Sequence, residues 1–335
     1  MSVKNAALAA AIGLLITLAP ARGIAADLTG DCCADLEARV AELESTTVRH
    51  GHKKLKMVIS GSIDAAIMAD SITNDAIVMS PIDGNRLRIE ASGVVAGEWT
   101  VGGVEELKLF PSGPVVNSAA YVYVSTKQIR LNLGNMAEAS RGAEQAAVAN
   151  TDPAAPLMTA FGVPLFHSLV NSNTVRLDLT PVSGLTLSVS YADTDHKDAA
   201  LFWGAVGNGF EASLGLGYRY DFADTTMLGS AGLRHTISGL FVQGGVAKEQ
   251  INNTLGWHVQ GGLEQNLLGF GASTVFAEIG KISSNLFPGQ PNLIGAGYVQ
   301  RVDVAGASLY LSARRYDDAA GATVDVGMAG ARINF

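Results

Sequence analysis

The chain has 335 residues, of which 48% are hydrophobic and 16% are charged, and its mean hydropathy is +0.23. After residue 26 no run of 18 apolar residues occurs, which excludes a helical membrane protein, and the net charge of −8 argues against nucleic-acid binding. High apolarity without long apolar runs, together with 38 Gly and 10 Pro, indicates strands that alternate apolar with polar residues.

Residues 1–26 have the pattern of a secretory signal peptide. Lys4 provides a positive start, an almost purely apolar stretch follows over 6–18, and small residues at positions 25 and 26 offer a cleavage site. A single membrane anchor is the alternative, but the apolar stretch is too short for one. Removal of Lys4 and Arg22 with this segment would leave 21 basic and 31 acidic residues, a net charge of −10.

A short helix is predicted over 31–50, inside a segment of helix and linker that spans 27–55. Its apolar residues recur at the a and d positions of a heptad, and charged residues fill the outer positions. The seam consists of Leu36, Val40 and Leu43. Two interpretations remain: an amphipathic helix against the mouth of a barrel, or a coiled coil formed by three copies of the chain. The narrow seam favours the coiled coil.

The two cysteines, Cys32 and Cys33, are adjacent in the sequence. In an oxidising compartment they would be free thiols, a strained vicinal disulfide, or cross-links to another subunit, and the sequence leaves these three states open. Asp31 stands where a lipoprotein signal needs a small residue. No Cys or His lies at ligand spacing from the pair, so no metal and no other cofactor is predicted.

From residue 56 to the C-terminus the hydrophobic period becomes two. Leu87 and Ile89, for example, alternate with Arg88 and Glu90, which suits a strand between lipid and water. Glu105 is the exception, because the alternation places this acid toward lipid. Sixteen strands are predicted near 57–69, 85–95, 99–110, 119–126, 128–134, 173–180, 185–192, 199–206, 210–220, 227–236, 239–249, 256–265, 271–281, 292–302, 306–316 and 322–335.

The predicted fold is therefore all-β: a sixteen-stranded antiparallel transmembrane β-barrel over 56–335, preceded by a short periplasmic helix. Short turns alternate with longer connections, as in outer-membrane barrels, and an even strand count places both termini in the periplasm. Aromatic residues near strand ends, such as Trp99 and Tyr220, predict girdles in contact with lipid and lipopolysaccharide. The terminal Phe335 resembles the signal that the barrel-assembly machinery reads.

The connection 135–172 is the longest, and loops of this length without regular structure are usually functional. Its apolar residues, among them Leu157, Phe161 and Phe166, predict that it packs against another part of the protein. A sixteen-stranded barrel leaves a water-filled channel, so a connection folded inward would narrow the lumen.

Opposed charges are predicted at this narrowing, where they would create a transverse field that selects polar solutes. The candidate acids in the connection are Glu138, Glu144 and Asp152. The candidate bases, on lumen-facing positions of nearby strands, are Arg86, Arg88, Arg130 and Arg176. The alternative is that these arginines only neutralise lumen acids such as Glu90 and Asp178.

Several segments resemble the porin family common in alphaproteobacteria. They are DCCADLEARVAELE, the strand containing Ser60–Gly61, VRLDLTPVSGLTLSVSYAD, GAGYVQRVDVAGASLYLSARRYD and the ending GARINF. The resemblance covers residues from about 31 to the C-terminus and implies a homotrimeric, sixteen-stranded porin with a periplasmic coiled coil. The chain departs from the family in the long connection, where a PEFGG-type segment is absent and GNMAEAS stands near its place.

The function predicted from these features is a water-filled channel for passive diffusion of small hydrophilic solutes and ions. A channel selective for sugars or carboxylates is the alternative, but Tyr310 and Phe276 are too few lumen aromatics to argue for sugar. A barrel enzyme is disfavoured because the six histidines are scattered and no G-x-S-x-G motif occurs.

Overall fold

The structure is a computed structural model of the whole chain. It describes residues 47–50, 53–71, 76–79, 85–109, 115–143, 149, 151, 172–193, 195–221, 224–285, 289–317 and 321–335. The chain divides into two units, Met1–Val48 and Arg49–Phe335, and the long strands all belong to the second. No helix among the described residues is long and apolar enough to cross a membrane.

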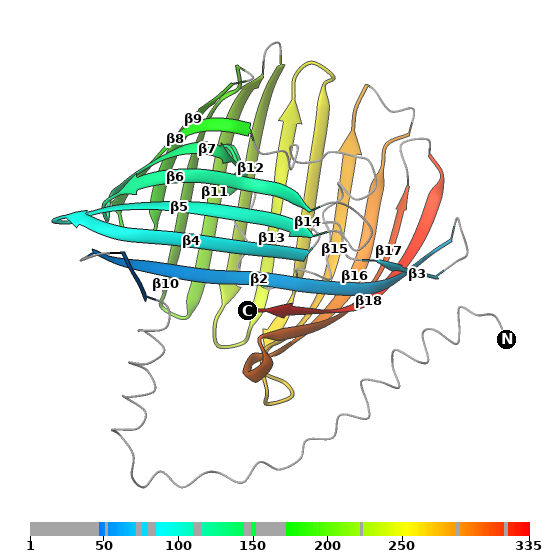
Figure 1. Cartoon of the computed structure of the whole chain (residues 1–335). Helices are drawn as coiled ribbons and strands as arrows, with labels where there is room; N and C mark the ends of the chain where they lie inside the picture. The colour runs from blue at the N-terminus through cyan, green and yellow to red at the C-terminus, as the bar shows by residue number, and fades with distance from the viewer. Residues whose placement is uncertain are drawn as a thin grey trace, which may run out of the picture. The chain divides into compact units, whose positions relative to one another are not determined.

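Sixteen long antiparallel strands form a closed barrel in the second unit (Figure 1). Each neighbour in sequence is a neighbour in the sheet, and β18 pairs with β2 to close the ring. The strands are β2 (Lys53–Asp70), β4 (Asn85–Ala96), β5 (Trp99–Leu109), β6 (Val116–Ser125), β7 (Ile129–Met136), β8 (Ser172–Val182), β9 (Leu185–Ala192), β10 (Lys197–Gly207), β11 (Phe210–Asp221), β12 (Asp224–His235), β13 (Leu240–Glu249), β14 (Thr254–Gln265), β15 (Ser273–Ser283), β16 (Asn292–Val302), β17 (Ala307–Asp317) and β18 (Thr323–Asn334).

All sixteen predicted strands are confirmed, and the described residues contain four further short elements that the sequence did not predict. β1 (Thr47–His50) is a strand at the end of the range predicted as helix, where β-branched residues favour extended backbone. β3 (Ala76–Met79) lies inside the predicted connection 70–84 and pairs with the end of β2. The helix α3 (Ser140–Ala143) and the 3₁₀ turn η2 (Asp303–Ala305) lie in connections.

Two predicted boundaries are wrong. The barrel begins at Lys53 rather than at 56, because the basic linker residues extend β2 and Lys56 still pairs with Ser92 of β4. The connection predicted over 221–226 consists only of residues 222–223, since Asp221 pairs directly with Asp224. The alternation of short and long connections therefore fails here, and it fails again where the connection between β14 and β15 (266–272) is longer than the one between β13 and β14 (250–253).

The inner and outer faces of the wall follow the two-residue period. On β6, Val122 and Val124 are 56% and 38% exposed, whereas Tyr123 between them is 5% exposed. The exposed set forms the apolar outer face, and the buried set contacts other polar side chains inside the barrel. The apolar outer face suits contact with lipid, where backbone hydrogen bonds must be satisfied within the sheet. The inside of the barrel adds a smaller buried apolar cluster that includes Phe241, Phe276 and Tyr310.

Inside the barrel, large rings cover glycines of the neighbouring strands. Tyr310 of β17 lies over Gly330 of β18, and a Cβ atom at position 330 would overlap its ring. The Tyr310 hydroxyl donates a hydrogen bond to Asp64 Oδ1 of β2 (2.6 Å). This packing fixes the register of β17, β18 and β2, where the barrel closes.

We expect Gly330→Val to destabilise the barrel by about 1–3 kcal/mol, because the new side chain would displace the Tyr310 ring. Gly327→Val on the same strand is the matched control, since a Cβ at position 327 meets no atom within 4 Å. Urea unfolding of the protein in lipid vesicles measures both. Equal midpoints for the two variants would contradict the role given to the Tyr310–Gly330 contact.

Candidate functional site: the channel lumen

The connection between β7 and β8 begins on the inner wall of the barrel. The backbone amides of Ala139 and Ser140 donate to the two carboxylate oxygens of Asp198 on β10, at 3.1 and 2.8 Å. Asp198 is 6% exposed and also accepts a hydrogen bond from Ser190 of β9. A carboxylate suits the start of α3, where backbone N–H groups have no partner within the helix.

Two glycines of β11 make room for α3 against the wall. A Cβ atom on Gly215 would overlap the backbone of Ala143, and one on Gly217 would come within 3.3 Å of Ser140. The hydroxyl of Ser230 on β12 donates to the Ala143 carbonyl. The helix therefore packs on β10, β11 and β12 through close backbone approach.

A second group of contacts lies farther round the barrel. The amide of Ala149 donates to Gln243 Oε1 of β13 (3.0 Å), and the Thr151 hydroxyl donates to Gln260 Oε1 of β14 (2.8 Å). Gln243 also donates to Gln260 (2.9 Å), and both glutamines are less than 8% exposed. The described pieces of the connection thus contact inner-face residues from β8 to β14.

Glu138, the one predicted acid among the described residues, is held by a histidine and an arginine at the wall. His196 Nδ1 lies 3.0 Å from its Oε1, and Arg219 Nε of β11 lies 3.4 Å from its Oε2. His196 Nε2 lies 2.7 Å from Asp221 Oδ1. Glu138 therefore anchors the start of the connection. Arg219 was not predicted as a site residue, although the alternation along β11 places it on the inner face, between the exposed Tyr218 and Tyr220.

The four predicted arginines lie together on the inner wall of β4, β7 and β8. Arg88 pairs with Glu90 (3.1 Å), Arg176 pairs with Asp178 (2.7 Å), and Arg86 lies 3.9 Å from Glu106. These pairs match the alternative interpretation, in which arginines neutralise lumen acids.

Arg130 differs from the other three arginines. Its guanidinium carbon lies 3.7 Å from the ring centroid of Tyr123, and its Nε donates to Asn132 Oδ1 (2.8 Å). Among the described residues no carboxylate lies within 4.0 Å of its guanidinium nitrogens. Stacking and one amide thus orient this cation, and Glu90 interacts with it electrostatically without a direct ion pair.

The remaining predicted site residues lie outside the described residues: Glu144 and Asp152 of the connection, and Leu36, Val40 and Leu43 of the seam. The same holds for residues 1–26 and for both cysteines. Within the described ranges no group of three or more His, Cys, Asp and Glu side chains is arranged to hold a metal ion.

Comparison with solved structures finds the same fold in several bacterial proteins. An anion-selective porin from Comamonas acidovorans superposes with a TM-score of 0.67 at 13% identity, over 84% of this chain and 100% of that chain. A loop-deletion mutant of OmpT, an outer-membrane protein of Vibrio cholerae, gives 0.65 at 14% identity, over 84% and 99%. A mutant of the Rh. blastica porin gives 0.61 at 17% identity, over 84% and 100%.

No protein-family model matches the chain, and no curated protein matches it. At these identities the likeness defines the fold: the chain has the closed sixteen-stranded barrel that is found in porins.

Proposed function

We propose that the protein is an outer-membrane porin, a water-filled channel through which small hydrophilic solutes and ions diffuse. The observation that carries this proposal is the set of contacts between the long connection and the inner wall, at Asp198, Ser230, Gln243 and Gln260. A connection held on the wall narrows the lumen without filling it, and a sixteen-stranded barrel is wide enough to remain open around it.

The constriction in this proposal lies between two unlike walls. One is the arginine wall of β4, β7 and β8, and the other is the connection with its acids Glu138, Glu144 and Asp152. Because Glu138 is already paired with Arg219 and His196, the proposal assigns the role opposite the arginines to Glu144 and Asp152, which lie outside the described residues. Opposed charges across water orient polar solutes and hinder apolar ones.

The setting in the cell belongs to the same proposal. The chain is secreted through residues 1–26, assembles as a homotrimer among lipid and lipopolysaccharide, keeps its N-terminus in the periplasm and belongs to the alphaproteobacterial porins. One solved neighbour is described as a trimer form. Phe335 lies where the barrel closes, because the Gly61 amide of β2 donates a hydrogen bond to the Phe335 carbonyl (2.8 Å). This position supports the proposal that Phe335 is part of the assembly signal.

Liposome swelling with sugars of graded size, and single-channel recording in planar bilayers, test the proposal together. We expect open channels at low voltage and swelling rates that fall steeply with solute size. A barrel that stays closed at every voltage and salt concentration would refute the channel. Hydrolysis of a fluorogenic lipid or peptide by pure protein would instead support the enzyme alternative.

Arg130 gives the channel a preference for anions in this proposal, because among the described residues no carboxylate forms a direct ion pair with it and Glu90 interacts with it only at longer range. We expect Arg130→Gln to lower the anion-to-cation permeability ratio by about twofold. Arg315→Gln is the control, since Arg315 is exposed and paired with Asp325. Reversal potentials in a salt gradient measure both, and equal ratios for Arg130→Gln and wild type would contradict the assignment.

A further inference from the structure

Basic side chains on the outer face of the wall lie at one end of the barrel. We call this end, which also carries the connection 137–171, the long-connection end. Lys197 is the first residue of β10 at this end, and the other three lie within two residues of the last residues of β13, β15 and β17. Cations at one rim suit a leaflet whose headgroups are anionic. Among the described side chains of β4–β18, the outward basic residues are Lys197, Lys248, Lys281 and Arg315.

Two of these four cations have a described partner on the protein. Arg315 is paired with Asp325 of β18, and Lys197 Nζ lies 6.0 Å from the centroid of an aromatic ring of β9. For Lys248 and Lys281, no described carboxylate lies within 4.0 Å of the ammonium nitrogen. Within the described part of the chain, these two lysines are therefore available to bind an anion.

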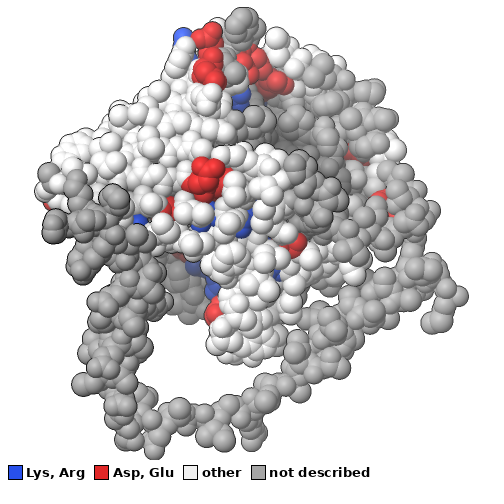
Figure 2. Space-filling view, viewed as in Figure 1, with Lys and Arg blue, Asp and Glu red and all other residues white. Residues whose placement is uncertain are grey.

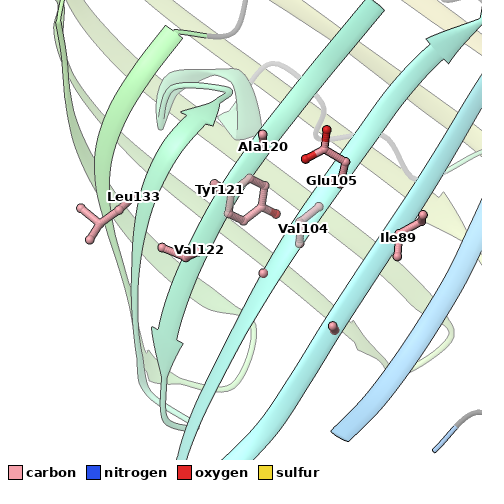
Figure 3. Close-up of a pocket in the computed structure, with 9 residues that line it drawn as sticks. Ile89, Val104, Glu105, Ala120, Tyr121, Val122 and Leu133 are labelled. Carbon is pink, nitrogen blue, oxygen red and sulfur yellow. The ribbon is translucent and has the colours of Figure 1, made fainter. Parts of the chain in front are cut away.

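Outward acids occupy other parts of the wall. The described strands carry Glu105 on β5, Asp317 on β17 and Asp325 on β18. Glu105 lies beside a hollow of β4–β7 (Figure 3), and Figure 2 shows acidic side chains over β5 and β6 with mostly uncharged neighbours. No described acid of β13–β16 points outward, so no carboxylate on the wall that carries the two lysines opposes the binding of an anion.

Lys248 and Lys281 flank β14 on the outer face. Lys248 of β13 pairs with Leu255, and Lys281 of β15 pairs with Trp257, two residues farther along β14. With strands about 4.8 Å apart and a rise of about 3.4 Å per residue, the Cα atoms of the two lysines lie roughly 12 Å apart. The flexible four-carbon stems allow both ammonium groups to approach one headgroup placed over β14.

The outer face changes from basic to apolar away from the long-connection end. Trp257 lies between the two lysines, with Val246 beside it on β13. Val259 and Ile279 pair with each other one step farther from that end, and they are 39% and 48% exposed. Tryptophan rings lie at the interface between headgroups and hydrocarbon. This order of cation, indole and apolar side chains follows the order of headgroup and acyl chains in a lipid.

We propose that Lys248 and Lys281, with Trp257 between them, bind the phosphorylated sugar headgroup of a lipopolysaccharide molecule on the outer wall of β13–β15. The proposal rests on the outer-membrane setting proposed above and adds which residues hold the lipid. Two ammonium groups on either side of β14 suit a headgroup with two phosphates, since each phosphate then has its own counter-charge. The acyl chains lie along the apolar residues nearer the middle of the wall.

Native mass spectrometry of the refolded full chain with diphosphoryl lipid A measures the affinity. Each lysine near an anionic headgroup contributes roughly fivefold to binding, so we expect Lys248→Gln, Lys281→Gln to weaken binding about 25-fold. The control Lys127→Gln, Arg315→Gln removes the same two charges. Lys127 lies between β6 and β7 at the other end of the barrel, 3.8 Å from Glu98, and Arg315 is already paired. The control should bind lipid A like the wild type.

The same affinity for the wild type and Lys248→Gln, Lys281→Gln would refute the site, and so would an equal loss of affinity in the control. Dephosphorylated lipid A and phosphatidylglycerol should bind weakly. A wild type that binds either of them as tightly as diphosphoryl lipid A would refute recognition of the phosphorylated headgroup. Heat-modifiable electrophoretic mobility reports folding, and if the double variant does not fold, each single variant should weaken binding about fivefold.

The conductance of the wild type in phospholipid bilayers separates this proposal from the channel proposal. A conducting wild type whose affinity for lipid A does not depend on the two lysines would refute this site alone. A closed wild type whose affinity does depend on them would refute the channel and support the site. Lys248→Arg, Lys281→Arg keeps both charges and should bind lipid A like the wild type, whereas a 25-fold loss in this variant would show that charge does not explain the binding.

Discussion

Replacing residues 137–171 by an Asn-Gly turn should raise the single-channel conductance about two- to threefold, because the wall of a sixteen-stranded barrel alone encloses a wider channel. Met136 and Ser172 are direct partners across β7 and β8, so a two-residue turn can close the hairpin without changing its register. Bilayer recording measures the conductance, and liposome swelling should show entry of larger sugars.

A shortened connection elsewhere at the same end of the barrel is the control. Asp317 and Thr323 pair across β17 and β18, so replacing residues 318–322 by Asn-Gly makes an equivalent hairpin. We expect the control to conduct like the wild type. If both variants conduct like the wild type, the connection 137–171 does not set the width of the channel, and the constriction must lie elsewhere on the wall.

Loss of the carboxylate at Glu278 should destabilise the barrel by about 3–5 kcal/mol, because it leaves the buried Arg314 guanidinium without its counter-charge. Glu278 and Arg314 form a direct ion pair in which both side chains are 2% exposed. His258 Nε2 and Gln260 Nε2 also lie within 3.1 Å of Glu278. We expect Glu278→Gln to lower the urea midpoint of unfolding in vesicles more than any other substitution considered above.

The double variant Glu278→Gln, Arg314→Gln distinguishes the effect of charge on the stability of the barrel from the effect of packing. Removing both partners leaves no unpaired charge, so it should recover part of the lost stability. Arg315→Gln, at an exposed pair on the outer face, is the control and should change stability by less than about 1 kcal/mol. A double variant that is less stable than Glu278→Gln would show that packing rather than charge explains the loss.

The strands were predictable because each strand has one face toward lipid and the other toward water. Apolar and polar residues therefore alternate along every strand with a period of two. Even the short β7 carries the pattern, with exposed Leu131 and Leu133 on either side of buried Asn132. The boundary at Lys53 and the strand β3 were missed. The basic residues at the start of β2 and the four residues of β3 show no alternation of apolar and polar residues, so the sequence does not distinguish them from a loop.

The candidate site was predictable only in part. Lumen-facing arginines follow from the alternation, which gives a residue its face but not its partner. Whether Arg176 meets Asp178 or stands opposite the connection depends on side-chain distances, and so does the difference between Arg86 and Arg130.

The sequence by itself determined that this protein is a sixteen-stranded barrel whose longest connection follows its fifth strand, because periodicity and connection length are local properties of the chain. Only the tertiary structure decided where that connection makes its contacts. Asp198, Gln243 and Gln260 come from three strands that are distant in sequence from residues 139–151, and only the closed ring brings their inner faces to those backbone amides and hydroxyls.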